Sequence, residues 1–192
     1  MKKVLLALMA VVIIAAGAAA EEKVLYSYET GLEGWEIPDW AYESDDYVSE
    51  NIEQSKDYAS QGKQSLKVNQ NFPGKRWTAS IVEIMEYLDL TPYTYLSCDV
   101  MVPKDAPSGL RAKLIVTVGD NWTWVEMSKT IKLEPGVWTT ISANLRPGSM
   151  DWKRTNPDDE WRADIRKVDI RIESNRKPEY NGPIYIDNVR VE

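Results

Sequence analysis

Hydrophobic and polar residues alternate along most of the chain from residue 23 onward, the pattern of strands that bury one face. Nine segments carry this pattern, and turn signals such as Pro73-Gly74 and Asn181-Gly182-Pro183 separate them. The segments are 23–28, 64–68, 78–84, 95–102, 112–118, 122–127, 137–143, 167–173 and 184–191. Nine or ten short strands at this spacing predict an all-β fold, an antiparallel sandwich or jelly roll. Only residues 156–162 have a helical pattern, that of one capped turn.

The first residues predict export. Two lysines precede an apolar run over residues 4–16, and small residues follow up to Ala20. This is the layout of a secretory signal peptide that is cut after Ala20. A retained membrane anchor is the alternative, but the apolar run is shorter than the about 20 residues of a usual bilayer span. We therefore expect residues 1–20 to be removed and residues 21–192 to form one domain, secreted to the periplasm or the medium and not bound to a membrane.

Composition removes several classes of chemistry. The chain has no histidine, which excludes Ser-His-Asp and Cys-His catalysis and every His-bound zinc or iron site. The single cysteine, Cys98, cannot form an internal disulfide and lies in an apolar strand pattern typical of the core. The net charge is −7, or −9 without Lys2 and Lys3. Because an acidic surface repels phosphate backbones, nucleic acid is not an expected partner.

The aromatic residues point to a surface that meets a polar ligand. Eight Trp and ten Tyr stand against one Phe, and Trp and Tyr are favoured where an apolar face also meets water or polar groups. Period-2 phase predicts which side chains of three strands point away from the core. This outward set consists of Arg111, Lys113, Ile115, Thr117, Trp122, Trp124, Glu126, Asp169, Arg171 and Glu173. A bulge would reverse the phase, so a register with Val125 outward and the tryptophans in the core stays open.

Several segments resemble the carbohydrate-binding modules that have a galactose-binding-like jelly roll. They are Tyr26-Ser27-Tyr28-Glu29 with Gly34-Trp35, residues 59–68 with Gly62-Lys63-Gln64-Ser65-Leu66, residues 90–103, and the closing Gly182-Pro183-Ile184-Tyr185-Ile186-Asp187-Asn188-Val189. The resemblance covers nearly all of residues 21–192 and is strongest to the mannan-binding modules attached to β-mannanases. Trp40, Trp77 and Trp124 stand where those modules carry tryptophans. Trp122 and the loop 149–161 depart from that pattern.

The resemblance implies a function and a site. Trp40, Trp77 and Trp124, with Trp122 in addition, would stack on sugar rings. Hydroxyl groups would be bound by Glu126, Arg171 and Glu173, with Lys113 and Asp99 as further candidates. The protein would then be a secreted, non-catalytic binder of a β-linked polysaccharide or oligosaccharide, β-mannan or glucomannan before β-glucan, and could work beside a separate glycoside hydrolase. Trp35 and Trp138 are expected to pack in the interior, and the pattern does not assign Trp152 or Trp161.

The resemblance also implies a structural Ca²⁺. Modules of this fold commonly hold a cation that joins the first and last strands away from the sugar site. By position its ligands here would be the side chains of Glu29 and Asp187 and backbone carbonyls near Gln61 and Lys63. Hard oxygen ligands of this kind suit calcium.

Two other functions fit the same fold class. A jelly-roll glycosidase needs two carboxylates about 5 to 10 Å apart, and Glu126 and Glu173 share a face. However, Glu83-Ile84-Met85-Glu86 lacks the Glu-x-Asp-x-x-Glu spacing of one such group of hydrolases, so we do not expect an enzyme. An envelope protein that binds other proteins is the second alternative.

Overall fold

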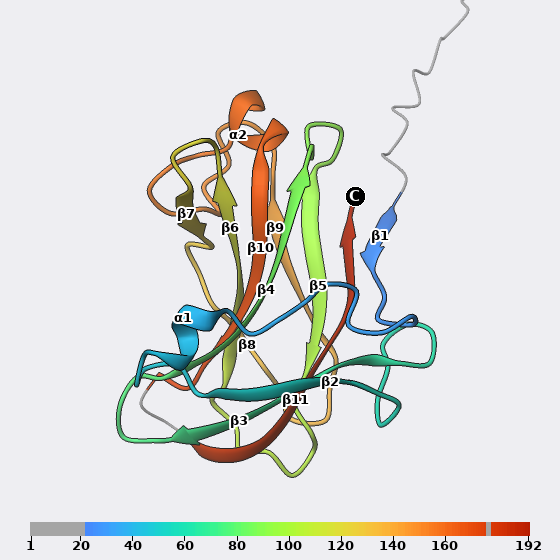
Figure 1. Ribbon diagram of the computed structural model, residues 1–192, viewed down its shortest axis with the longest axis vertical. Coiled ribbons are helices and arrows are strands. Elements are labelled where there is room, and N and C mark those ends of the chain that lie inside the picture. The colour runs from blue at the N-terminus through green and yellow to red at the C-terminus, as the bar shows by residue number, and fades with distance from the viewer. Residues whose placement is uncertain (1–21, 176–177) are drawn as a thin grey trace, which may run out of the picture.

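The computed structural model describes residues 22–175 and 178–192 and consists almost entirely of two antiparallel sheets (Figure 1). The predicted signal peptide, residues 1–20, lies outside the described residues. Within those residues, no helix is both long and apolar enough to cross a bilayer. The predicted all-β sandwich is confirmed.

The first sheet has the strand order β2-β3-β11-β5-β9, with β1 paired to β11. Its strands are β1 (Lys23–Tyr26), β2 (Ser49–Ser55), β3 (Ser65–Pro73), β5 (Tyr95–Met101), β9 (Thr139–Asn144) and β11 (Glu179–Val191). The long β11 pairs with β3 along its first part and with β5 and β1 along its last part. In Figure 1, β2 and β3 run across the view whereas β5 and β9 run along it, so this sheet is strongly twisted.

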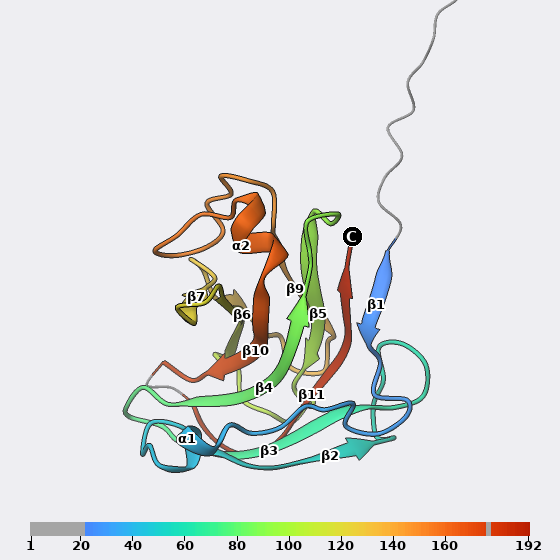
Figure 2. The same cartoon turned by 45° about the horizontal axis from the view of Figure 1, so that its top comes forward.

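The second sheet has the order β4-β10-β6-β7, with the short β8 paired to β6 (Figure 2). Its strands are β4 (Ala79–Leu88), β6 (Arg111–Val118), β7 (Thr123–Glu126), β8 (Ile131–Lys132) and β10 (Ile165–Glu173). Two short helices, α1 (Asp39–Tyr42) and α2 (Asp159–Ala163), complete the fold. The predicted capped turn is α2, in which Asp158 accepts the Trp161 N–H at 2.7 Å.

Two strands, β2 and β8, lack a pattern that sequence alone reveals. In β2 the only apolar residue is Ile52, and β8 is two residues long. The strand β2 lies at the edge of its sheet, where polar side chains are tolerated and help to prevent edge-to-edge association.

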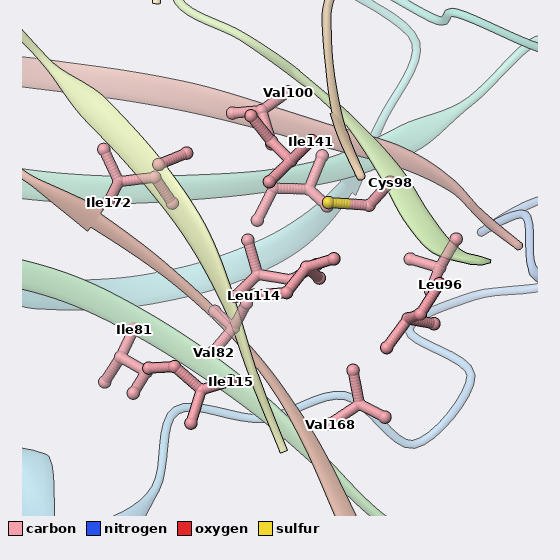
Figure 3. Close-up of a cluster of buried hydrophobic side chains, with 14 of the residues drawn as sticks. Ile81, Val82, Leu96, Cys98, Val100, Leu114, Ile115, Ile141, Val168 and Ile172 are labelled. Carbon is pink, nitrogen blue, oxygen red and sulfur yellow. The ribbon is translucent and has the colours of Figure 1, made fainter. Parts of the chain in front are cut away.

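The core lies between the sheets. Figure 3 shows Cys98, Val100 and Ile141 of the first sheet gathered with Val82, Leu114, Val168 and Ile172 of the second. Cys98 is fully buried, as predicted, and burial raises the pKa of its thiol. Val125 is also fully buried in this cluster, so the alternative register with Val125 outward is wrong.

The segment between β1 and β2 covers part of the second sheet on the face turned away from the core, called here the outer face. Glu36 and Glu83 exchange two backbone hydrogen bonds of 2.9 and 2.8 Å, and Val48 N–H donates to Ala79 at 2.8 Å. The segment thus runs beside β4 and carries α1 over the outer face. Ile115, on a central strand and with outward phase, is fully buried and belongs to the same hydrophobic cluster as Trp35 and Ile37 of this segment.

Candidate functional site

Four aromatic rings follow one another over the outer face. The ring centroids of Tyr47 and Trp77 are 6.1 Å apart, those of Trp40 and Tyr47 4.7 Å, and those of Trp40 and Trp124 6.1 Å. Trp77 precedes β4 and Trp124 lies on β7, so the four rings reach from one edge strand to the other. We call these four residues the aromatic row. Each neighbouring pair is edge-to-face, a favourable arrangement for aromatic rings.

The aromatic row is partly open to solvent. Trp40 is 37% exposed, whereas Tyr47, Trp77 and Trp124 are half-buried. Strand alternation positions Trp124, because Val125 beside it points into the core. Tyr47 and Trp40 come from the segment that pairs with β4, so their place depends on backbone contacts formed only in the folded state.

Glu126 is the centre of a charged group beside these rings. Its Oε2 lies 2.9 Å from Lys113 Nζ and 2.6 Å from Arg171 Nη2, and its Oε1 lies 3.2 Å from Lys153 Nζ. Partial burial alone would raise the pKa of Glu126. The hydrogen bond from Lys113 and the charges of Arg171 and Lys113 outweigh burial and lower the pKa to about 2. Glu126 is therefore a fixed, ionised acceptor.

Arg171 connects the charged group with the aromatic row. Its guanidinium carbon lies 5.5 Å from the ring centroid of Trp77, a cation–π contact. Its Nη2 also approaches Glu173 at 3.5 Å. Arg171 therefore has its orientation set by two carboxylates and one indole, with its planar donors on the same face as the aromatic row.

Two carboxyl groups lie beneath this surface. Asp169 of β10 and Glu83 of β4 are cross-strand partners, and Asp169 is fully buried. Lys167 Nζ donates to Glu83 Oε1 at 2.6 Å, but within the described part of the chain both oxygens of Asp169 lack a hydrogen-bond partner. Burial, followed by repulsion from Glu83, raises the pKa of Asp169 well above its usual range. Asp169 thus favours a retained proton.

A family model described as mannanase, galactose-binding domain-like, matches residues 26–188. The chain belongs to this family. Its members are non-catalytic carbohydrate-binding domains, in agreement with the prediction that the chain is not an enzyme. No curated protein sequence matches the chain.

Solved structures similar to this member of the mannanase galactose-binding-like family include carbohydrate-binding modules. The CBM27-1 module of Caldicellulosiruptor saccharolyticus, solved with mannohexaose, is 19% identical, with a TM-score of 0.62 over 91% of this chain and 98% of that one. A CBM28 module specific for non-crystalline cellulose is 20% identical, with a TM-score of 0.65 over 91% and 97% of the two chains. The mannan-recognising module TmCBM27 is 21% identical, with a TM-score of 0.52 over 90% and 95%. At these identities the likeness shows the fold.

The structure brings together most of the residues that the sequence suggests for binding. Trp40, Trp77, Trp124, Glu126, Arg171 and Glu173 share the outer face, and Lys113 contacts Glu126. Sequence reasoning missed Tyr47, which lies in a segment without strand alternation. Asp99 is not part of the site. It lies on β5 in the other sheet, where Thr140 Oγ1 donates to it at 2.7 Å and Arg190 lies 3.3 Å away.

Trp122 stands apart from the aromatic row. It precedes β7 and has a φ of 51°, so the predicted strand alternation does not extend to it. Its ring lies instead over the guanidinium of Arg166, 5.3 Å from the ring centroid.

Three of the other four tryptophans are buried. Trp35 is 2% exposed, and its ring centroid lies 5.6 Å from that of Tyr26 and 6.2 Å from that of Tyr28. It packs in the interior, as predicted. Trp138, also predicted to pack, is half-buried. Trp152 and Trp161, which the sequence left unassigned, are buried against each other at 5.4 Å.

The residues expected to hold calcium meet at one loop, residues 60–64. Asp187 Oδ2 accepts the Gln61 N–H at 3.0 Å, and Glu29 Oε1 accepts the Lys63 N–H at 2.7 Å. Both carboxylates thus fasten this loop through its amides. Among the described residues no three His, Cys, Asp or Glu side chains are grouped to bind a metal, so a cation here would depend on carbonyl oxygens as well. The calcium site stays a prediction.

Proposed function

We propose that the chain is a secreted, non-catalytic protein that binds a β-linked polysaccharide or oligosaccharide, with β-mannan or glucomannan preferred and β-glucan next. The observation that carries the proposal is the aromatic row with Glu126 and Arg171 beside it on one face. Secretion is supported by the signal-peptide pattern of residues 1–20. The chain belongs to a family whose description names mannanases, and this supports the preference for mannan.

The chemistry of the surface fits a sugar. A pyranose presents a weakly apolar C–H face that an indole ring can cover, and an edge of hydroxyl groups that needs donors and acceptors. Glu126 offers ionised acceptor oxygens, and Arg171 offers several donors in a plane of fixed orientation. Because salt bridges and stacking already set these orientations, little side-chain entropy is lost when the ligand binds.

The arrangement of the rings favours a single soluble chain over a crystalline surface. Interplanar angles along the aromatic row are 88°, 88° and 78°, from Trp77 to Trp124. Rings turned at right angles to one another cannot all lie flat against one planar surface. They can contact successive sugar residues of a chain whose own faces turn along its length.

Affinity electrophoresis tests the proposal. The wild-type protein and Trp124→Ala are run through gels that contain mannan, glucomannan, β-glucan or xylan. We expect mannan and glucomannan to retard the wild type most, and Trp124→Ala to move as in a gel without polysaccharide. Tyr58→Ala is the control, since Tyr58 is 44% exposed and packs on Tyr185 of the other sheet. Unchanged migration of the wild type in every gel would contradict the proposal and favour the envelope-assembly alternative.

A separate glycoside hydrolase as working partner is a second part of the proposal. If the protein delivers such an enzyme to its substrate, adding it to a purified β-mannanase should raise sugar release from insoluble mannan and leave release from a soluble oligosaccharide unchanged. Equal release from insoluble mannan with and without the protein would oppose this part alone.

A further inference from the structure

A second pair of exposed aromatic rings lies on the same sheet, beyond the end of the aromatic row. Tyr87 near the end of β4 is 66% exposed and Trp122 before β7 is 43% exposed. Arg166 of β10 lies between them, with its guanidinium carbon 5.5 Å from the Tyr87 centroid and 5.3 Å from the Trp122 centroid. We call Tyr87 and Trp122 the distal pair.

The arginine at the centre of the distal pair is paired with two carboxylates of the protein. Arg166 Nε and Nη2 lie 3.0 and 2.8 Å from the two oxygens of Asp164, a fork-to-fork contact, and Nη2 also contacts Asp120. Two carboxylates thus neutralise one guanidinium, whose side chain is only 12% exposed. Arg166 is therefore no anion-binding group. It acts as a spacer that fixes the two rings by cation–π contacts.

Trp122 is held in a conformation that few bulky residues adopt. Its φ of 51° lies in the left-handed region, which is sterically unfavourable for a residue with a side chain. A tight turn fixes it, since Trp122 N–H donates to Gly119 at 3.0 Å. In the free protein, both the backbone strain of Trp122 and the exposure of its apolar ring are unfavourable. Residues with strained backbones of this kind cluster at ligand sites.

The distal pair continues the surface of the aromatic row. On β10, Lys167 is paired with Thr117 on one side and Met85 on the other, and Thr117 is paired with Trp124. A register shift between Ile165 and Lys167 introduces Arg166 at the next position. Arg171 and Arg166 are five residues apart, roughly 16 Å at about 3.3 Å per residue of strand. One sugar ring cannot span this length, but an oligosaccharide can.

We propose that the distal pair is an additional sugar subsite, so that a bound chain runs along the outer face from Trp77 past Trp124 to Trp122. The inference rests on the proposed function and adds a length requirement to it. Met85, 54% exposed, lies on β4 in the same rung as Trp124 and two residues before Tyr87, so an exposed apolar side chain also borders the distal pair on this edge strand. In Figures 1 and 2, the end of β4 and the start of β10 lie near α2, away from β3 and α1, which places the distal pair at the far end of the surface.

Calorimetric titration with mannotriose and mannohexaose tests this subsite. Trp122→Asn is the main variant, because Asn tolerates the left-handed region and should preserve the turn. Tyr87→Ala is the second variant, and Tyr58→Ala is the control. We expect Trp122→Asn and Tyr87→Ala each to weaken mannohexaose binding about tenfold, equal to about 1.4 kcal/mol, and mannotriose binding less than twofold.

The outcomes separate the two proposals. If both variants bind mannohexaose as the wild type does while Trp124→Ala does not, the additional subsite is refuted and the proposed function stands. If the two variants weaken mannotriose and mannohexaose binding equally, the distal pair is not a separate subsite and the inference also fails. If the wild type binds neither sugar nor glucan or xylan fragments of the same lengths, the proposed function itself fails.

Discussion

Asp169 and Glu83 face each other across β10 and β4, directly beneath the surface that carries the aromatic row. Asp169 is fully buried, and its raised pKa results first from burial and then from the carboxylate of Glu83. A core of apolar residues would avoid both effects. A carboxyl group buried here costs stability, which is usual for groups kept near a ligand site.

The first prediction concerns stability and pH. Because the pKa of Asp169 is raised in the folded state, folding takes up a proton, and stability falls as pH rises above the unfolded value of about 3.9. Asp169→Asn removes this uptake. We expect the variant to be at least as stable as the wild type at neutral pH and to lose less stability between pH values of about 4 and 8.

Urea unfolding followed by tryptophan fluorescence at several pH values measures this effect. Asp45→Asn, at an exposed acid, is the control and should follow the wild type. A variant Asp169→Asn that is less stable than the wild type at neutral pH, with an unchanged slope against pH, would show that the buried carboxyl is ionised and paired.

The second prediction concerns Glu126. Glu126→Gln leaves Lys113, whose side chain is only 4% exposed, and Arg171 without the carboxylate that neutralises them. We expect a loss of about 2–4 kcal/mol in the free energy of unfolding at neutral pH. Since the folded pKa is lowered to about 2, this contribution is present above the unfolded value of about 4.3 and is lost as pH falls towards 2.

Chemical denaturation at neutral and acidic pH tests that sign. Glu134→Gln is a matched control, because Glu134 pairs with Lys132 at 2.7 Å on the exposed surface, and its loss should change stability by no more than about 0.5 kcal/mol. Equal losses in both variants would mean that the group around Glu126 is as well solvated as an ordinary surface pair.

The third prediction is the structural calcium. We propose that a cation binds at Glu29, Asp187 and the carbonyls of residues 60–64, and its removal by a chelator should lower the melting temperature and leave mannan binding intact. Calcium added back should restore the melting temperature. If a metal-free sample melts at the same temperature with and without calcium, the amide hydrogen bonds to Asp187 and Glu29 suffice to hold the loop.

Much of this fold can be predicted from the sequence, because successive side chains of a strand point to opposite faces of the sheet. Val125 is buried, so Trp124 and Glu126 must point outward, and the structure places both on the outer face. The pattern fails at Trp122, where a positive φ interrupts the extended backbone before β7 begins. No alternation can reveal such a turn when a tryptophan occupies a position that glycine or asparagine would favour.

The rest of the site depends on contacts between distant segments. Tyr47 reaches the surface because Val48 and Asp46 bond to the backbone of Ala79. Asp169 is fully buried although its strand phase directs it away from the core, so the phase predicts the direction of the side chain and not its environment. The resemblance to a family assigned Trp40 and Trp77 to sugar binding, but it did not predict how far apart the two rings lie in the fold.

The last prediction separates two tryptophans that are five residues apart. Trp35 is 2% exposed and packs on Tyr26 and Tyr28, so Trp35→Ala should cost about 3–5 kcal/mol in the free energy of unfolding. Trp40 is 37% exposed and lies in the aromatic row, so Trp40→Ala should cost about 1 kcal/mol or less and weaken mannohexaose binding tenfold or more, equal to about 1.4 kcal/mol. Thermal unfolding and calorimetry on both variants measure the two effects. The prediction is wrong if Trp40→Ala destabilises the protein as much as Trp35→Ala does and still binds sugar normally. The rings of the aromatic row would then stabilise the fold without contacting a ligand.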